Sequence, residues 1–350
     1  MSGLFTTQDL IGVTRKVKAL PKFFLTFFNR EIAFESEEIA FDRVSTNYNQ
    51  VAPFVAPVAQ GRVMREEGFS RLAFKPAYLK PKNVVDPNMV LPVQPGESAL
   101  RGTLSNAQKR AAVITHLVMK QDMSIDNRLE WMAAQAALYG YCDVEGEDYP
   151  KTRVDFGRDP ALTITVDWRA SNTSRNPMDD LKDARFMVSD KSQSGAVVRD
   201  WVMGGDAWNL FWEAHKTEII ELMKIDIRGS TTEVTRVWDG LEGVEFMGSI
   251  AGVNGAGRIN IWVNTQRYKD IDGVLKYLMP QNAVWGATDA IEGVRCFGAI
   301  MEAGIGYQAV SKYPKNWINQ DPSVEYIMTQ SAPLMVPVDP NSSVLLFVTP

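Results

Sequence analysis

One stretch constrains the fold of this chain more than any other, the region from residue 105 to residue 140. Ser105 and, three residues later, Gln108 match a capping box, which satisfies free amides at the start of a helix. Apolar residues then recur at the spacing of one helical face: Ile114, Leu117, Val118, Ile125, Leu129, Met132 and Ala136. Gly140 follows, and glycine readily adopts the left-handed conformation that ends a helix. The pattern predicts a helix from residue 106 to residue 139, about 51 Å long at roughly 1.5 Å per residue.

The predicted helix is longer than most helices of globular proteins, which average roughly 10–14 residues. It cannot cross a membrane, because charged side chains are scattered along it: Lys109, Arg110, Lys120, Asp122, Asp126, Arg128 and Glu130. Two interpretations remain open at this point. The helix is either a core helix of a mixed α/β enzyme or a structural spine that crosses a thin, flat subunit.

Composition limits the class of protein. With 350 residues, 45% of them hydrophobic, the chain can bury a large core in one to three domains. Its net charge of −5 does not suggest a nucleic-acid binder, although a protein that only encloses DNA needs no basic surface. Cys142 and Cys296 have no metal or redox spacing and are expected to be buried thiols in a reducing compartment. Neither a signal peptide nor a membrane-spanning run is present, so we expect synthesis in the cytoplasm and no membrane partner.

The N-terminal region, residues 1–50, keeps neither a helical nor a strand period for long. It contains a dense apolar cluster within six positions: Phe23, Phe24, Leu25, Phe27 and Phe28. Side chains of this size favour burial. We therefore expect an arm that lies over a neighbouring subunit or over its own core.

Residues 51–93 contain two β-prone segments, 51–64 and 71–85, joined by a charged tip. Prolines in both segments remove backbone donors and exclude a central position in a sheet. An isolated two-stranded ribbon is marginally stable, so it should lean on another chain; the alternative is a ribbon packed on its own domain. The tip suits charge-complementary contact with a neighbour. The candidate contact residues are Arg65, Glu66, Glu67, Phe69 and Arg71 of the ribbon and Phe24, Phe27 and Phe28 of the arm.

The chain beyond residue 140 alternates strand and helix patterns. A hairpin is predicted at 141–156, a strand at 161–168, a helix capped by Asn176, and a strand at 195–203. A second long helix should begin at Asp206 and present Trp208, Phe211, Trp212, Ile219, Leu222 and Met223. Asn254-Gly255 predicts a hairpin between 244–250 and 258–263. This alternation indicates a mixed sheet with helices packed on it.

Residues that commonly carry catalysis are sparse. His116 and His215 lie within predicted helices and have no metal-binding or triad pattern around them, and no nucleophile elbow is found. Asp179 and Asp180 are explained by their place in the first turn of a helix. Gly255-x-Gly257 lacks the third glycine and the lysine of a phosphate loop. We therefore expect no catalytic, cofactor or metal site, and no enzymatic activity.

Several segments resemble a known family. Residues 74–82, FKPAYLKPK, resemble the F-x-P-G-Y-x-K-P-K segment of lambda-type major capsid proteins of tailed bacteriophages, with Ala77 in place of the usual glycine. Residues 311–340 resemble the end segment of the same family, and 23–39 and 51–64 are similar more weakly. Between 161 and 289 the similarity is faint.

The resemblance implies an α+β fold of the HK97-like capsid type. Its parts would be an N-terminal arm (1–50), an extended β-hairpin loop (51–93), a peripheral domain (94–160) with the spine helix 105–140, an axial α/β domain (161–293), and a return through the peripheral domain (294–350) in which 344–348 is a candidate strand of the axial domain.

The implied function is that of a major capsid protein, which self-assembles as pentamers and hexamers into the icosahedral head around double-stranded phage DNA. The chain would be made in the cytoplasm of a bacterial host and end in the virion, without a cofactor. A small decoration protein and a portal are implied partners. Because the arm-like sequence starts almost at Met1, scaffolding is expected from a separate protein.

Two alternatives belong to other classes. An encapsulin-like cage shares the fold but encloses cargo enzymes, and a soluble α/β enzyme would act as a small oligomer around a polar pocket. The segment 311–340 favours the capsid subunit over the cage.

Overall fold

The computed structural model describes 22–36, 38–44, 69–85, 106–146, 149–169, 176–192, 194–214, 241–250, 258–270, 272–321 and 324–349. Its helices are η1 (Phe24–Phe27), α3 (Asn106–Tyr139), α4 (Pro177–Lys191), η2 (Pro160–Leu162), η3 (Asp289–Ile291), η4 (Ala303–Ile305), η5 (Pro340–Ser342) and a helix described over 205–214. Its strands are β1 (Arg30–Ala33), β2 (Ile39–Val44), β3 (Phe69–Phe74), β4 (Lys82–Val85), β5 (Tyr141–Gly146), β6 (Tyr149–Asp155), β7 (Thr163–Asp167), β8 (Asp200–Met203), β9 (Val244–Ile250), β10 (Ile259–Asn264), β11 (Arg267–Lys269), β12 (Leu275–Tyr277), β13 (Ala283–Ala287), β14 (Val294–Phe297), β15 (Tyr313–Ile318), β16 (Glu325–Gln330), β17 (Pro333–Val336) and β18 (Val344–Thr349).

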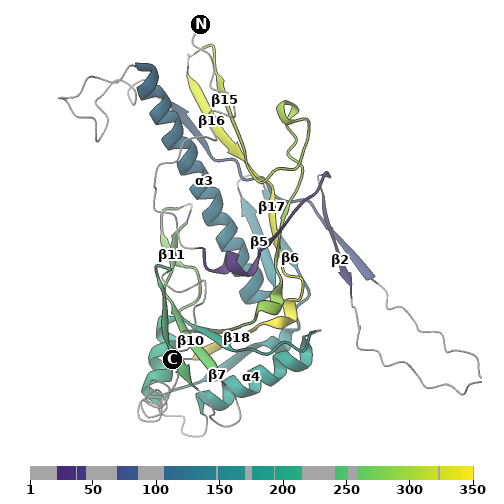
Figure 1. The fold of residues 1–350 in the computed structure, drawn as a ribbon, viewed down its shortest axis with the longest axis vertical. Coiled ribbons are helices and arrows are strands. Elements are labelled where there is room, and N and C mark those ends of the chain that lie inside the picture. The colour runs from purple at the N-terminus through teal and green to yellow at the C-terminus, as the bar shows by residue number, and fades with distance from the viewer. Residues whose placement is uncertain are drawn as a thin grey trace, which may run out of the picture.

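The helix α3 runs along the upper part of an elongated molecule, and a six-stranded sheet with α4 closes the lower end (Figure 1). Two three-stranded sheets accompany α3, one in the order β15-β16-β4 and one in the order β1-β14-β17. The six-stranded sheet has the order β7-β18-β13-β8-β10-β9 and mixes parallel and antiparallel pairs. The pairs β2–β3, β5–β6 and β11–β12 form separate two-stranded sheets.

The predicted spine helix is confirmed, because α3 spans 34 residues and ends before Gly140, whose φ of +70° is left-handed. Every apolar residue of the predicted face is buried. The first half of the helix packs against Val85 of β4 and Ile327 of β16, and the second half joins the main core cluster. The capping residue Ser105 lies outside the described part of the chain.

The last turn of α3 is fastened to the lower part of the molecule by side-chain donors. The carbonyl of Ala137 accepts hydrogen bonds from Nε1 of Trp285, at 3.2 Å, and from Oγ of Ser343, at 3.1 Å. Arg158 donates to the carbonyl of Leu138 and, at 2.9 Å, to that of Leu162. Burial lowers the pKa of Arg158 to about 10, yet the cation lies at the negative end of the helix dipole. Carbonyls that would otherwise lack partners therefore join α3 to β13 and to the segment before β7.

The aromatic cluster of the N-terminal region packs on its own subunit. Phe24 and Phe28 are fully buried and Phe27 is 6% exposed. The rings of Phe24 and Phe27 lie 5.4 and 5.0 Å from that of Trp285. Of the two arrangements expected for the arm, the structure shows burial in its own core. Contact of Phe24, Phe27 and Phe28 with a neighbour stays a prediction, and within the subunit almost no surface of these rings remains exposed.

A buried carboxylate holds this cluster to the spine. Glu130 of α3 is 2% exposed and accepts hydrogen bonds from the amides of Phe24, at 2.6 Å, and Leu25, at 3.0 Å. Burial raises its pKa to about 7, although these amides partly offset the rise. The following strand β1 then pairs in parallel with β14. Residues 22–33 are thus part of the subunit's own packing.

The ribbon differs from the predicted hairpin. The strand β3 pairs with β2 of residues 39–44, whereas β4 pairs with β16 beside α3. The predicted segment 71–85 is therefore two strands, and the ribbon begins before residue 51. The prolines explain the difference: Pro76 and Pro81 lie in the extended connection between β3 and β4, where they interrupt a single long strand. The segment 51–64 lies outside the described residues.

Most elements expected beyond residue 140 are confirmed. They include the 141–156 hairpin as β5–β6, the 161–168 strand as β7, and the two strands predicted around Asn254-Gly255 as the antiparallel pair β10–β9. Asn176 caps α4 through its side-chain oxygen, which accepts from the amide of Met178 at 2.8 Å. The strand predicted at 195–203 is shorter, covering only β8. The helix expected at Asp206 begins at 205, and its continuation beyond 214 lies outside the described residues.

The end of the chain returns to both parts of the molecule. Strands β16 and β17 lie in the two sheets beside α3, and β18 lies between β7 and β13 in the six-stranded sheet. The candidate strand 344–348 is thus part of β18.

In the segment that connects β13 to β14, the ring of Phe28 packs directly on Gly293. A Cβ atom at position 293 would lie 2.3 Å from that ring, so only glycine fits there.

Leu129→Asp tests the buried face of α3. Leu129 is 6% exposed within the main cluster, so the new carboxylate would be buried without a partner. We expect the free energy of unfolding to fall by several kcal/mol, comparable to the whole stability of a domain. Denaturant unfolding of the purified subunit measures the change. Ser124→Asp adds the same charge at an exposed position of α3 and should shift stability by less than about 0.5 kcal/mol. Equal unfolding midpoints for the two variants would contradict burial.

Glu130→Gln tests the buried carboxylate through its pH dependence. Because the pKa of Glu130 is about 7 when folded and near its usual 4.5 when unfolded, the folded state holds the proton more tightly. Stability from this group is therefore complete below pH 4.5 and is lost as pH rises through 7. Relative to Glu130→Gln, the parent should gain up to about 3 kcal/mol between pH 8 and pH 4.5. Thermal unfolding of both proteins across this range is the measurement, and parallel curves would refute the assignment.

Candidate functional site

The predicted contact residues of the ribbon are only partly described. Arg65, Glu66 and Glu67 lie outside the described residues. Phe69 and Arg71 lie in β3, where their backbones pair with Val44 and Asp42 of β2. Both positions therefore belong to the outer half of the β2–β3 ladder.

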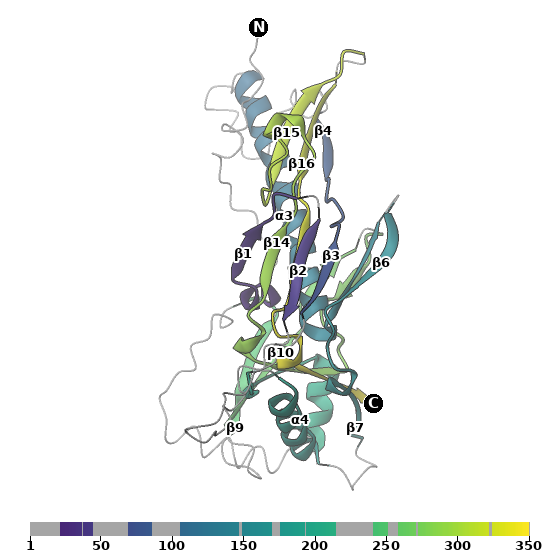
Figure 2. The same ribbon diagram turned by 90° about the vertical axis from the view of Figure 1, so that its right-hand side faces the viewer.

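The ribbon β2–β3 leaves the body of the molecule sideways (Figure 1), and in Figure 2 both strands run along the side of the subunit that faces the viewer. At its root, Ile39 is fully buried and Phe74 packs against the main core. From this root the ladder runs out to the pair formed by Val44 and Phe69. Two strands with so little core of their own are marginally stable in water, so contact with another chain would support them.

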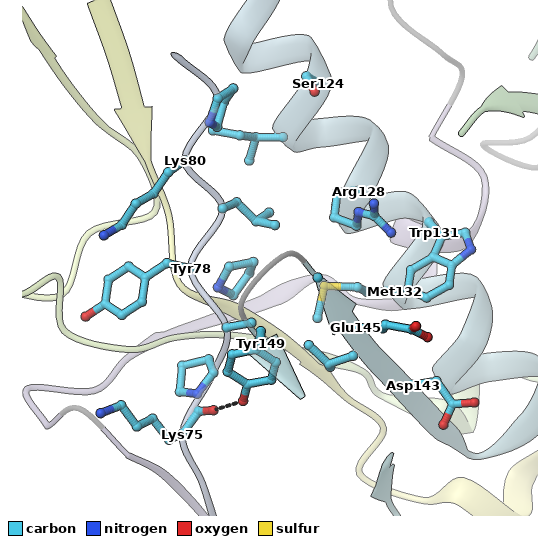
Figure 3. A pocket seen from close by; sticks show the side chains of 18 of the residues that line it. Lys75, Tyr78, Lys80, Ser124, Arg128, Trp131, Met132, Asp143, Glu145 and Tyr149 are labelled. Atoms are coloured by element: carbon cyan, nitrogen blue, oxygen red, sulfur yellow. Dashed lines mark hydrogen bonds between the residues drawn. The ribbon is translucent and has the colours of Figure 1, made fainter. Parts of the chain in front are cut away.

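A groove of about 730 Å³ lies between α3, the β5–β6 hairpin and residues 75–81. Figure 3 shows Tyr78 and Lys80 on one side of it and Arg128, Trp131 and Met132 on the other. The segment 75–81 belongs to the stretch that resembles the capsid family. Ala77 is outside the set of residues with left-handed backbone, so alanine fits where the family has glycine.

The polar groups around the groove are engaged with one another. Asp143 accepts two hydrogen bonds from Arg153, at 2.6 and 2.8 Å, which hold its pKa below the usual value. The guanidinium of Arg128 lies 5.0 Å from the centre of the Trp131 ring, and Tyr78 donates to the carbonyl of Ala299. Because these charged groups are already paired and lie beside aromatic rings, the groove is better suited to binding another protein surface than to acid–base catalysis.

The described residues also offer few groups for metal or thiol chemistry. They contain no group of three His, Cys, Asp or Glu side chains that could hold a metal ion. Burial raises the pKa of Cys142 and Cys296 to about 12, so neither thiol ionises readily. His116 is exposed on α3, and His215 lies outside the described part. None of the helices in that part combines the length and apolarity needed to span a bilayer.

One aromatic surface was not predicted from the sequence. On the face of the β15-β16-β4 sheet away from α3, the rings of Trp317 and Tyr326 stack at 5.5 Å. Lys82 of β4 places its ammonium 3.9 Å from the centre of the Tyr326 ring and 5.2 Å from that of Trp317. The segments 313–318 and 325–330 can be recognised as strands in the sequence, and Trp317 and Tyr326 could be assigned to one face of each strand. Only the pairing of the two strands, however, brings these side chains together.

Comparison with known proteins agrees with this architecture. The family described as phage major capsid protein E matches residues 6–348. The major capsid protein of Enterobacteria phage P21 is 33% identical over 357 residues, which cover 99% of this chain and 99% of the relative. That of Escherichia phage lambda is 31% identical, covering 97% and 98%. A crystal structure of a prophage capsid protein from E. coli CFT073 superposes with a TM-score of 0.70 at 24% identity, covering 94% of each chain.

The family matches nearly the whole chain, and the superposition over 94% of the chain shows the same fold. The long spine, the lateral ribbon and the six-stranded sheet are therefore parts of one known architecture. The chain belongs to the phage major capsid protein E family and has the HK97-like fold of tailed-phage capsid proteins.

Proposed function

We propose that this chain self-assembles as pentamers and hexamers into the icosahedral head of a tailed bacteriophage, around double-stranded DNA. The observation that carries the proposal is similarity to proteins named major capsid protein over 97–99% of the chain. No large part of the chain is left over for a separate enzymatic domain. Its role in the virion is therefore assembly, and the net charge of −5 fits enclosure of DNA without sequence-specific binding.

The parts of the subunit take distinct roles in this proposal. The six-stranded sheet with α4 forms the axial domain, near the symmetry axis of each capsomer. The helix α3 and the sheets beside it form the peripheral domain, and the ribbon β2–β3 reaches a neighbour. The tip residues Arg65, Glu66 and Glu67 make charged contacts there, while Phe69 and Arg71 hold the base of the tip. A portal, a separate scaffold and a small decoration protein complete the set of partners, by analogy with the family.

The direct test is production of the chain together with the genes that neighbour it, followed by electron microscopy. We expect closed shells of pentamers and hexamers, with double-stranded DNA in particles from infected cells. A protein that stays monomeric under every assembly condition would contradict the proposal. Shells that contain a protein cargo and no DNA would favour an encapsulin-like cage.

Shortening the ribbon tests its role between subunits. Val44 and Phe69 are directly paired, so a two-residue Asn-Gly turn can replace residues 45–68 without changing the register. The isolated variant should keep its circular dichroism and its melting temperature, because the main core lies elsewhere. Shell formation should be lost, because the contact with the neighbour is removed.

A Gly-Ser linker of the same length in place of residues 45–68 is the matched control. It keeps the original number of residues between the two strands but replaces the charged and apolar side chains and the prolines with a flexible chain. If the linker variant assembles like the parent, the side chains of the ribbon tip are not needed. If the shortened variant unfolds, the ribbon belongs to the core of its own subunit.

A further inference from the structure

The outer face of the β15-β16-β4 sheet is aromatic and open to solvent, whereas the inner face packs on α3 through Ile327. Paired residues share one face of an antiparallel ladder, so the outer face contains Lys82, Val84, Lys315, Trp317, Tyr326 and Met328. We call this surface the lysine–aromatic face. A solvated sheet face is usually polar, but here Val84 is 43% exposed beside stacked rings. Apolar side chains gathered at a surface are typical of a contact region.

This face carries positive charge that the subunit itself does not fully neutralise. Lys82 and, beside the sheet, Lys80 are exposed and form no ion pair with a described residue. Their ammonium groups lie 3.9 and 4.7 Å from the centres of the rings of Tyr326 and Tyr78. Lys315, by contrast, pairs with a carboxylate of its own subunit at 2.7 Å. An ammonium over a ring keeps donors free, so a partner's carboxylates could bind Lys80 and Lys82.

Residues 31–38, which we call the acidic segment, form a surface of opposite charge. They comprise most of β1, an edge strand of its sheet, and the turn that follows. The exposed carboxylates, none of which pairs with a described cation, are those of Glu31, Glu35 and Glu38. Ile32, between them, is 42% exposed. The only nearby cation in sequence, Arg30, already pairs with Glu292 at 3.7 Å. The acidic segment thus combines unpaired carboxylates with an apolar side chain.

The two surfaces adjoin on one side of the subunit. The carbonyl of Ser36 accepts a hydrogen bond from the amide of Ala299, at 3.1 Å, and the carbonyl of Ala299 accepts one from the hydroxyl of Tyr78, at 2.9 Å. The turn of the acidic segment is therefore close to the chain that leads into β4. In Figure 2 the β15-β16-β4 sheet lies in front of α3, and β1 lies below it on the same side. Complementary surfaces on one side can meet in two copies related by a two-fold axis.

We propose that two copies of this chain dock about a two-fold axis, with the acidic segment of each on the lysine–aromatic face of the other. The inference rests on the proposed function, in which such a pair joins neighbouring capsomers of the shell. Ile32 would lie against Val84, and Glu35 would face Lys82. A ring contact, in contrast, would join two different sides of the subunit. Opposite charges on the two surfaces also disfavour contact between two copies of the same surface.

Cysteine cross-linking between chains tests the contact directly. Ile32→Cys and Val84→Cys keep every charge and place thiols at exposed positions, whereas Cys142 and Cys296 are buried. Shells assembled from a mixture of the two single variants and treated with a bismaleimide should give a band of two linked chains. In the control mixture Phe186→Cys, at a 57% exposed position of α4, replaces Ile32→Cys. The control should give no such band, and neither should each variant alone.

The double variant Ile32→Cys/Val84→Cys tests the symmetry of the contact. In a two-fold pair both thiols of one chain face the same partner, so linkage should stop at two chains. A ladder that continues to five and six chains would place the contact around a capsomer and would overturn the two-fold arrangement.

A charge exchange provides an independent measurement. Lys82→Glu and Glu35→Lys should each lower the yield of shells, because each places like charges in contact. The double variant Glu35→Lys/Lys82→Glu should restore the yield, since the charges are again opposite. Lys120→Glu is the matched control: it makes the same change at an exposed position of α3, on the helix that covers the inner face of the sheet. It should assemble like the parent.

The outcomes separate this inference from the function on which it rests. If the mixed variants form shells but give no band of two chains, or if Lys82→Glu assembles as well as the parent, the docking contact is wrong and the capsid function stands. Failure of the parent chain to form any shell would remove both proposals.

Discussion

The rest of the structure depends on the hydrogen bonds that side chains donate to the carbonyls in the last turn of α3. A helix ends with carbonyls that have no partner in the helix itself. Here Trp285, Ser343 and Arg158 supply the donors, and all three come from segments outside the helix. Gly140 allows the tight exit, since a Cβ at this position would lie 2.4 Å from the side chain of Arg158. The spine and the six-stranded sheet are thereby held in one orientation.

The same end of the helix gathers the N-terminal segment. Trp285 donates to the helix through its ring nitrogen and receives the rings of Phe24 and Phe27 on its surface. Glu130, two turns earlier, binds the backbone of that segment. A buried carboxylate is costly unless hydrogen-bond donors surround it, and here the amides of Phe24 and Leu25 supply them. The arm, the spine and the six-stranded sheet therefore share one junction.

A subunit fixed in this way leaves its sides free for contacts with other copies. The ribbon β2–β3 and the hairpins β5–β6 and β11–β12 are each two-stranded and lie outside the larger sheets. Exposed ion pairs contribute less than about 1 kcal/mol each. Contacts of this strength are individually reversible but sum to a large total when repeated in every subunit of a shell. A rigid subunit whose individual contacts with its neighbours are weak can leave a wrong position and bind again, so errors of assembly can be corrected.

The sequence by itself determined the local elements. Helical periodicity located α3, the Asn176 cap located α4, and Asn-Gly indicated the β9–β10 hairpin, because each signal depends on neighbouring residues. The family resemblance supplied the fold class and the function. Tertiary structure decided which distant segments pair: β2 with β3, β4 with β16, and Phe24 and Phe27 with Trp285. Composition shows that such residues favour burial, but it does not show against which surface. That choice follows from the packing of segments more than 200 residues apart, as between Phe24 and Trp285, which no local pattern records.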